Sequence, residues 1–245
     1  MDITALLCVK NGEKFIRSTI ESILHQTFRD FELLIIVNCS TDTTLDIINE
    51  YKDDRIRVFT TNICQLSFNL NFGLNLAKGK YIARIDADDI AFPERLEKQI
   101  NVITAHNYDI VGSNIDIVDE NGDYLRTNRF PESNKIIRKK ILYRSVIAHP
   151  TILVKKEVLL SVSGYLGGRY AQDYDLWLRL MRNKNIQFYN IQEPLLKYRI
   201  HSNQTKGNKN SYAEVAGYFL KESIYSKRLI YILSAVLYYF KSLIR

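Results

Sequence analysis

The sequence has few cysteines and none of the common phosphate-binding loops. Cys8, Cys39 and Cys64 lie in or beside apolar runs without the spacing of a metal site, so we expect buried free thiols in a reducing compartment. No G-x-x-x-x-G-K-S/T loop occurs, and no G-x-G-x-x-G follows the first predicted strand. These absences argue against a P-loop enzyme and against a dinucleotide-binding fold.

Signals for secretion, membrane insertion and nucleic-acid binding are also missing. The N-terminus enters an apolar segment without a basic region before it, so we expect no signal peptide. The most apolar stretch, residues 229–240, is shorter than the roughly 20 residues that a membrane-spanning helix needs. The net charge of +7 fits nucleic acid, anionic lipid or phosphorylated substrates. Because no nucleic-acid-binding motif accompanies this charge, we expect no nucleic-acid partner.

Strands and helices alternate through the first half of the chain. Buried strands are predicted at 3–9, 31–37, 55–59 and 80–86. With helices between them, this order predicts an α/β fold with a mainly parallel sheet. The loops at residues 10–13, 38–42 and 86–89 then lie at one edge of the sheet, where open α/β sheets bind ligands. We therefore expect a nucleotide pocket at this edge.

Three carboxylates end the strand at 80–86. They are Asp86, Asp88 and Asp89, and Pro93 follows them at the expected start of the next helix. If the chain stays extended, Asp86 and Asp88 project to the same side. Two carboxylates at the carboxyl end of a strand suit Mg²⁺ or Mn²⁺ holding a diphosphate. Taken alone, the stretch also fits an Asp-rich turn that only caps the helix.

The second half of the chain is predicted to be mixed. Its elements are a helix at 94–106, a hairpin of strands at 109–118 and 124–127, a helix at 132–142 and a strand at 150–154. No linker separates the two halves, so we expect one domain over residues 1–205. Residues 206–245 are expected to form a helical tail.

The tail combines an apolar run with tyrosines and flanking cations. Lys227 and Arg228 precede residues 229–240, and two further basic residues follow them. Such a segment suits the membrane interface, so one expectation is peripheral membrane contact through residues 226–245. A helix packed on the domain, or on a second subunit of a homodimer, is the alternative.

Several short motifs follow one another in a specific order. They are Asn11-Gly12-Glu13, Ser40-Thr41-Asp42, Arg84-Ile85-Asp86-Ala87-Asp88-Asp89, Ala148-His149-Pro150, Asp173-Tyr174-Asp175-Leu176-Trp177 and Tyr198-Arg199-Ile200-His201. In this order and spacing they resemble the family 2 glycosyltransferases of the GT-A fold, a Rossmann-like α/β fold. The resemblance covers residues 3 to about 205.

The resemblance implies an inverting glycosyltransferase of the EC 2.4 class, moving a hexosyl or N-acetylhexosaminyl group. The donor would be a nucleoside diphosphate sugar, a UDP-sugar by analogy, and the acceptor a hydroxyl of a glycan or lipid-linked sugar. Mn²⁺ or Mg²⁺ would be the cofactor. The implied setting is bacterial polysaccharide or lipopolysaccharide assembly, in the cytoplasm or on the cytoplasmic face of the membrane.

The family pattern also implies roles for particular residues. Asp173 would be the general base, and Asp88 and His201 would be metal ligands; the alternatives are helix capping for Asp173 and a phosphate or water contact for His201. The residues expected to contact the nucleotide-sugar are Asn11, Glu13, Asn38, Arg84, Asp86 and Ala87.

Three positions depart from the family pattern. Val37 stands where an acidic residue often pairs with the nucleotide base; since valine cannot accept a hydrogen bond, Asn38 or backbone groups must read the base. Leu70 stands where many members have an arginine aimed at the diphosphate, a charge that Arg84 could supply. Gln172 replaces a glutamate beside the general base, which removes a like charge and alters the expected pH optimum.

Two other functions fit parts of the sequence. A sugar nucleotidyltransferase can share the sheet and the metal carboxylates, but it usually carries a Gly-rich first loop, which residues 10–13 match poorly. A non-catalytic nucleotide-sugar-binding subunit of a polysaccharide assembly complex is suggested by Val37 and Gln172. The intact Asp86, Asp88 and Asp173 favour the transferase.

Overall fold

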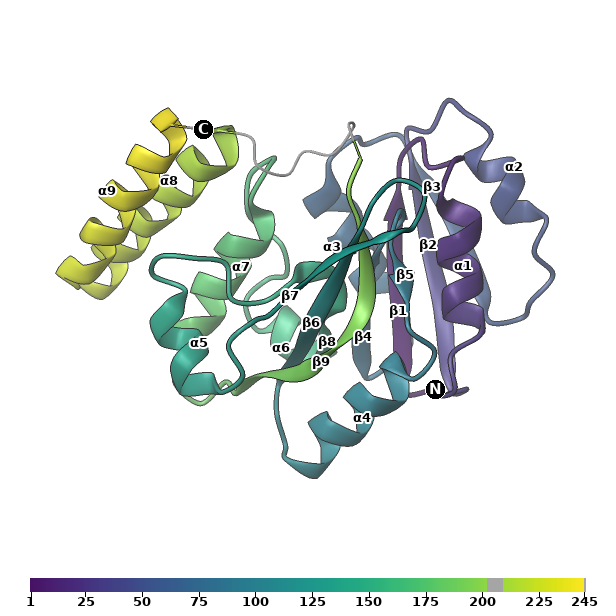
Figure 1. Cartoon of the computed structure of the whole chain (residues 1–245), viewed down its shortest axis with the longest axis horizontal. Helices are drawn as coiled ribbons and strands as arrows, with labels where there is room; N and C mark the ends of the chain where they lie inside the picture. Colours follow the sequence, from purple (N-terminus) through teal and green to yellow (C-terminus); the bar gives the residue numbers. More distant parts are fainter. Residues whose placement is uncertain (202–208, 245) are drawn as a thin grey trace.

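The computed structural model describes residues 1–201 and 209–244 (Figure 1). Four parallel strands form its N-terminal part: β1 (Ile3–Val9), β2 (Phe31–Asn38), β3 (Ile56–Thr61) and β4 (Tyr81–Asp86), in the order β3-β2-β1-β4. The helices α1 (Ile16–Leu24), α2 (Thr44–Asn49) and α3 (Leu66–Leu76) alternate with these strands. The predicted α/β order of this half is confirmed.

The remaining strands make the sheet mixed. They are β5 (Ile90–Ala91), β6 (Ile110–Val118), β7 (Tyr124–Asn128), β8 (Leu153–Lys155) and β9 (Phe188–Arg199). β8 lies antiparallel between β4 and β6, β9 runs parallel to β6, and β7 forms the predicted hairpin with β6. The sheet order is β3-β2-β1-β4-β8-β6-β9-β5, with β7 paired on β6.

Helices cover both faces of the sheet and bury the apolar residues of its central strands. Along β1, Ile3 and Leu7 point to one core and Leu6 and Cys8 to the other, as strand alternation requires. α1, α2 and α4 (Arg95–Ala105) belong to the first core. On the opposite face lie α3, α5 (Asn134–Lys140), α6 (Lys156–Leu160) and α7 (Gln172–Met181). Burial on both faces explains the continuous aliphatic run of the central strands.

The C-terminal helices pack against the domain. α8 (Lys209–Ser226) and α9 (Leu229–Ile244) lie side by side next to α7 (Figure 1). Val215 and Phe219 of α8 are buried in the same core as Trp177 of α7, and Arg182 pairs with Glu222 of α8 at 2.5 Å. The tail therefore packs on the domain, which was the alternative to membrane contact, through α8 and through one face of α9. No helix among residues 1–201 and 209–244 has the length and apolarity needed to cross a membrane.

Candidate active site

A cavity of about 830 Å³ opens at the carboxyl ends of β1 and β4. It extends past the first turn of α7 to the C-terminal helices. Its charged and polar lining includes residues of the β1 loop, the β4 end, the start of α7, the segment after β9 and the tail, namely Lys10, Asn11, Arg84, Asp86, Asp88, Asp173, His201, Tyr212, Tyr238 and Lys241. Of the three loops predicted to form the ligand-binding edge, those at 10–13 and 86–89 line this cavity, whereas the loop at 38–42 does not.

Most of the predicted site residues meet in the cavity. Those lining it are Asn11, Arg84, Asp86, Ala87, Asp88, Asp173 and His201. Glu13 and Asn38 are not part of the lining. The Glu13 carboxylate accepts hydrogen bonds from the Thr43 backbone N–H at 3.1 Å and from the Thr43 hydroxyl at 2.7 Å. Asn38 is buried at the end of β2. Neither residue therefore forms part of the cavity surface.

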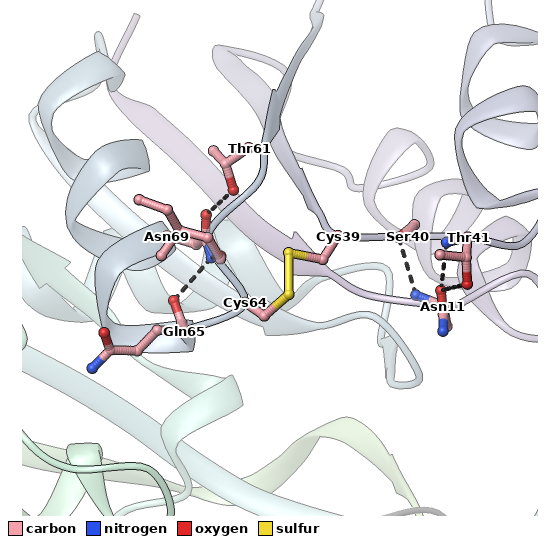
Figure 2. Close-up of a disulfide and its surroundings, with 9 residues drawn as sticks. Asn11, Cys39, Ser40, Thr41, Thr61, Cys64, Gln65 and Asn69 are labelled. Atoms are coloured by element: carbon pink, nitrogen blue, oxygen red, sulfur yellow. Dashed lines mark hydrogen bonds between the residues drawn. A yellow bond between two sulfur atoms is a disulfide. The ribbon is translucent and has the colours of Figure 1, made fainter.

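The loop after β1 is braced against the loop after β2. The Asn11 backbone N–H donates to Ser40 Oγ at 3.1 Å, and the Thr41 backbone N–H donates to Asn11 Oδ1 at 2.9 Å (Figure 2). Asn11 adopts a φ of +50°, in the left-handed region that asparagine tolerates better than most residues. This conformation turns the loop back toward its neighbour.

Cys39 and Cys64 form a disulfide on the other side of this loop (Figure 2). The expectation of free thiols is therefore wrong for these two residues and holds only for the buried Cys8, whose burial raises the pKa of its thiol to about 12. The sequence concealed the pairing because 25 residues separate the two cysteines. They meet because β3 runs parallel to β2. The two strands therefore end beside each other, and the chain after β3 passes Cys39.

The turn after β4 is joined to the end of β9. The Arg199 backbone N–H donates to Asp89 Oδ1 at 3.0 Å, and Arg199 Nε donates to the Asp88 carbonyl at 3.0 Å. These bonds bring His201 to Asp88, with Nε2 2.9 Å from Asp88 Oδ2. The Phe15 ring lies 5.2 Å from the His201 ring. Sequence reasoning left open whether Asp89 caps the next helix; instead, it holds β9.

Asp89 and Arg84 are the buried ionisable residues of this cluster. Burial, with the nearby carboxylates Asp86 and Asp88, raises the pKa of Asp89 well above its ordinary value. Arg84 is 1% exposed, and its guanidinium lies 2.5 Å from Asp86 Oδ1. Arg84 Nε has no hydrogen-bond partner among the described residues. A buried cation with an unused donor beside a cavity suits an anionic ligand.

Asp173 lies in the first turn of α7, on the same cavity. Burial raises the pKa of its carboxyl group and the charge of Asp86 raises it further, whereas the hydrogen bond from the Tyr174 backbone N–H, at 2.8 Å, opposes this. A carboxylate with a raised pKa is a better proton acceptor near neutral pH than an ordinary one.

Glu214 of α8 holds the segment that leads into Asp173. Its carboxylate accepts hydrogen bonds from the backbone N–H groups of Arg169, Tyr170 and Ala171 at 2.9, 3.0 and 2.9 Å. A Cβ at Gly168 would lie only 2.7 Å from this carboxylate, so a larger residue there would displace the Glu214 side chain. Sequence reasoning missed Glu214, because only tertiary packing brings α8 to this segment.

His149 forms part of the cavity wall. Its Nε2 hydrogen-bonds with the Tyr165 hydroxyl at 2.9 Å, and its ring lies 6.0 Å from that of Trp177. Burial lowers the pKa of His149 well below its ordinary value, and the charge of Arg84 lowers it further. The imidazole is therefore neutral at physiological pH.

Asp88 and His201 could together bind a divalent cation that a bound small molecule also coordinates. Carboxylate oxygen and neutral imidazole nitrogen are both good donors to Mn²⁺, and carboxylate oxygen is a good donor to Mg²⁺. No group of three or more His, Cys, Asp or Glu side chains that could hold a metal occurs in the described part of the chain.

The fold is GT-A-like. It matches the crystal structure of S. aureus TarS 1-349 in complex with UDP-GlcNAc with a TM-score of 0.74 and 20% sequence identity, covering 90% of this chain and 67% of that chain. It also matches the mannosyltransferase PcManGT from Pyrobaculum calidifontis in complex with GDP-Man and Mn²⁺, with a TM-score of 0.64 and 13% identity, over 99% of this chain and 73% of that chain.

Sequence comparison gives the family. The profile of Glycosyl transferase family 2 matches residues 4–160. The O-antigen biosynthesis glycosyltransferase WbnJ of Escherichia coli is 37% identical over 99% of this chain and 97% of its own length. The E. coli UDP-Glc:alpha-D-GlcNAc-diphosphoundecaprenol beta-1,3-glucosyltransferase WfgD is 30% identical over 81% of this chain and 77% of its own length. The chain belongs to glycosyl transferase family 2 and is a glycosyltransferase of the EC 2.4 class.

The disulfide predicts a simple thiol count. Unreduced protein, denatured to expose every side chain, should titrate one thiol per chain, that of Cys8, because Cys39 and Cys64 are paired. The Cys39→Ser variant should titrate two, since Cys64 then loses its partner. The measurement is a titration with a chromogenic thiol reagent before and after reduction. Three thiols in the unreduced wild-type protein would contradict the pairing.

Proposed function

We propose that this glycosyltransferase moves a sugar from a nucleoside diphosphate sugar, with a UDP-sugar as the first candidate, to a hydroxyl of a glycan or lipid-linked acceptor with inversion. One observation carries the proposal: a single cavity holds both the Asp86–Asp88–His201 group and the Asp173 carboxylate. The names of the relatives, which concern O-antigen biosynthesis and a diphosphoundecaprenol-linked acceptor, support polysaccharide assembly as the setting.

The donor would bind over the carboxyl ends of β1 and β4. Asn11, Asp86 and Ala87 line the cavity there, and Arg84 places a buried positive charge beside it. Glu13 and Asn38 would position the loops around the nucleotide instead of contacting it from the cavity. Since the Asn38 side chain is buried, backbone groups of the loop after β2 are the better candidates for reading the nucleotide base.

Asp88 and His201 would hold Mn²⁺ or Mg²⁺ together with the donor's diphosphate. Such an ion stabilises the charge that develops on the leaving diphosphate. The P. calidifontis structure, a distant relative in fold, contains Mn²⁺ with GDP-Man. In this chain, Arg199 fixes both ligands, because it bonds to the turn that carries Asp88 and lies two residues before His201.

Asp173 would remove the proton of the acceptor hydroxyl. As the acceptor oxygen bonds to the anomeric carbon, the bond from that carbon to the diphosphate oxygen breaks, and the hydroxyl proton passes to the Asp173 carboxylate. Glu214 would act as a positioning residue, since it fixes the segment that precedes α7.

Nucleotide and metal binding can be measured by thermal denaturation. At a ligand concentration of 100 times the dissociation constant, the preferred nucleoside diphosphate with Mn²⁺ should raise the melting temperature by roughly 5–10 °C. EDTA and the Asp88→Asn substitution should each remove the metal-dependent part of this rise in melting temperature. Asp46→Asn, on the exposed side of α2, serves as the matched control.

The nucleotides to be compared in this experiment are UDP, GDP, dTDP and CDP. A shift that is equal in Asp88→Asn and the control, with and without metal, would contradict the role of Asp88. No shift with any of the four nucleotides would contradict the proposed donor class.

The pH dependence tests Asp173. A general base acts only when deprotonated, so wild-type kcat/KM should fall as the pH drops through a pKa above the ordinary aspartate value. Gln172→Glu should move this acidic limb to higher pH, because a neighbouring like charge raises the pKa further. Asp173→Asn should lower kcat about 10²- to 10⁴-fold while the nucleotide-dependent thermal shift persists. Retention of more than a tenth of kcat in Asp173→Asn would rule out this assignment.

Residues 226–245 would bring the enzyme to a membrane surface. The outer face of α9 is apolar and exposed, with Leu233 65% and Leu243 64% accessible. The full-length protein should therefore float with vesicles that contain anionic lipid. Leu233→Glu/Leu243→Glu should abolish flotation, whereas Leu125→Glu and Leu160→Glu, at exposed leucines elsewhere, should not. Equal flotation of all variants would exclude α9 as the contact.

A further inference from the structure

His149 lies at the wall of the cavity, beside the strand that ends in the carboxylates. It begins a short 3-10 helix, His149–Thr151, which precedes β8. The Arg84 backbone N–H donates to the Ile152 carbonyl at 3.0 Å, so this helix is held next to the end of β4. His149 is 7% exposed and lines the cavity. The accessible part of this residue therefore lies at the cavity.

One ring nitrogen of His149 is bonded to Tyr165. The Tyr165 hydroxyl lies 2.9 Å from His149 Nε2, and it makes no other hydrogen bond with the described residues. Tyr165 is buried, so the hydrogen of its hydroxyl group needs an acceptor within the protein. The Tyr165 O–H is therefore assigned as the donor and Nε2 as the acceptor. Since burial holds the pKa of His149 well below its ordinary value, the ring is neutral at physiological pH, and its single hydrogen is then on Nδ1.

The other ring nitrogen is open to the cavity. Nδ1 of His149 makes no hydrogen bond with any residue that the structure describes, and protein atoms do not enclose it. An N–H donor in a buried wall needs an acceptor, which is either water or an oxygen atom of a ligand. Phosphate oxygens are bound most strongly by charged donors such as that of Arg84. A neutral N–H in the same cavity suits an uncharged oxygen, such as that of a sugar.

The imidazole of His149 is held in one orientation. Asn71 of α3 donates through Nδ2 to the Tyr165 carbonyl at 2.8 Å, and its Oδ1 accepts the Tyr165 backbone N–H at 2.8 Å. The backbone of Tyr165 is thus fixed on both sides. The rings of Tyr165 and Trp177 lie 5.4 and 6.0 Å from the His149 ring, each nearly edge to face. These contacts restrict rotation of the imidazole, so that Nδ1 faces the cavity in a single way.

His149 and Tyr165 lie between the proposed diphosphate site and the proposed base. Burial lowers the pKa of His149, and the charge of Arg84 lowers it further. Burial also raises the pKa of Tyr165; Arg84 opposes this rise, whereas Asp173 and Asp86 add to it. Such effects come from charges close to the group. In a bound nucleoside diphosphate sugar, the part between the diphosphate and the attacked carbon's acceptor is the sugar that is transferred.

We propose that His149 recognises the transferred sugar, with its Nδ1–H donating a hydrogen bond to an oxygen atom of that sugar. Tyr165 is a positioning residue, because it acts through His149 by determining which ring nitrogen carries the hydrogen. This inference rests on the proposed transferase function and adds a specificity-determining residue to it. It gives His149 no part in the proton transfer to Asp173.

The test compares the binding of UDP with the binding of UDP-sugars to the full-length protein in the presence of Mn²⁺. UDP-glucose, UDP-galactose and their two N-acetylhexosamine counterparts are the probes, and calorimetry gives the ratio of each UDP-sugar dissociation constant to that of UDP. For the sugar that the wild type binds most tightly, His149→Gln should raise this ratio about tenfold, because the glutamine amide replaces Nε2 and not Nδ1. His149→Asn, whose amide nitrogen lies near the position of Nδ1, should raise it only about two- to threefold.

Two further variants complete the experiment. Tyr165→Phe keeps the ring but removes the hydroxyl, so the hydrogen of His149 is no longer confined to Nδ1. The ratio should then rise about threefold while the affinity for UDP stays unchanged. His106→Gln, at an exposed histidine that follows α4, is the matched control and should leave the ratio as in the wild type.

Several results would overturn the assignment. One is the same ratio in His149→Gln and the wild type for every sugar. Another is an equal loss of affinity for UDP and UDP-sugar in His149→Gln, since His149 would then only support the fold of the site. An effect of His149→Asn as large as that of His149→Gln would contradict the role of Nδ1. Failure of the proposed donor would appear separately, as a wild-type protein that binds neither UDP nor any of the UDP-sugars.

Discussion

The hydrogen bonds between Arg199 and the turn after β4 join parts of the chain 111 residues apart in sequence. Asp89 is fully buried and accepts the Arg199 backbone N–H, while the Arg199 side chain donates to the Asp88 carbonyl. His201 follows two residues later and reaches Asp88 as a consequence. Without this attachment, the β4 turn would carry carboxylates but no imidazole. The metal-binding role proposed for the site thus depends on how β9 ends.

The ionisable side chains at the end of β4 are partly or fully buried, so each of them needs a partner or a bound proton. Three carboxylates follow one another closely after β4, and their mutual repulsion is relieved in two ways. Arg84 is buried beside Asp86 at 2.5 Å, and Asp89 has a pKa well above the ordinary value, so that it keeps its proton to higher pH. A buried charge without a partner costs free energy. A buried ion pair that faces a cavity can replace some of the contacts between its two members by contacts to a ligand. The cluster thus combines a buried positive charge with carboxylates beside one cavity.

The C-terminal helices have two different faces. Phe219 and Tyr238 pack into the core that contains α7, and Glu214 holds the segment before Asp173 through three backbone N–H groups. The outer face of α9 remains apolar and exposed. A single segment therefore holds the residues that precede Asp173, lines one end of the cavity and exposes an apolar face. This arrangement links the position of the general base to the docking of the tail.

The sequence by itself determined the alternation of strands and helices, since the aliphatic runs of β1 and β2 and the helical periodicity between them are local patterns. It also determined the Asp cluster at the end of β4 and, through the order of its motifs, the family. The predicted strand at 31–37 is observed as Phe31–Asn38, whereas the prediction of a strand at 150–154 is wrong for its first residues, because His149–Thr151 form a 3-10 helix and β8 begins only at Leu153.

Only the tertiary structure decided the contacts between distant segments. The Cys39–Cys64 pair and the bonds of Glu214 join residues that no spacing rule connects, and the structure shows the contact between Asp88 and His201 that the family resemblance had only implied. Likewise, Glu13 and Asn38 lie outside the cavity lining. The Glu13 carboxylate accepts a hydrogen bond from Thr43, and Asn38 is buried at the end of β2. Local patterns report which residues are buried or extended, but loop packing and helix docking depend on the whole fold, and these decide which side chains face one another.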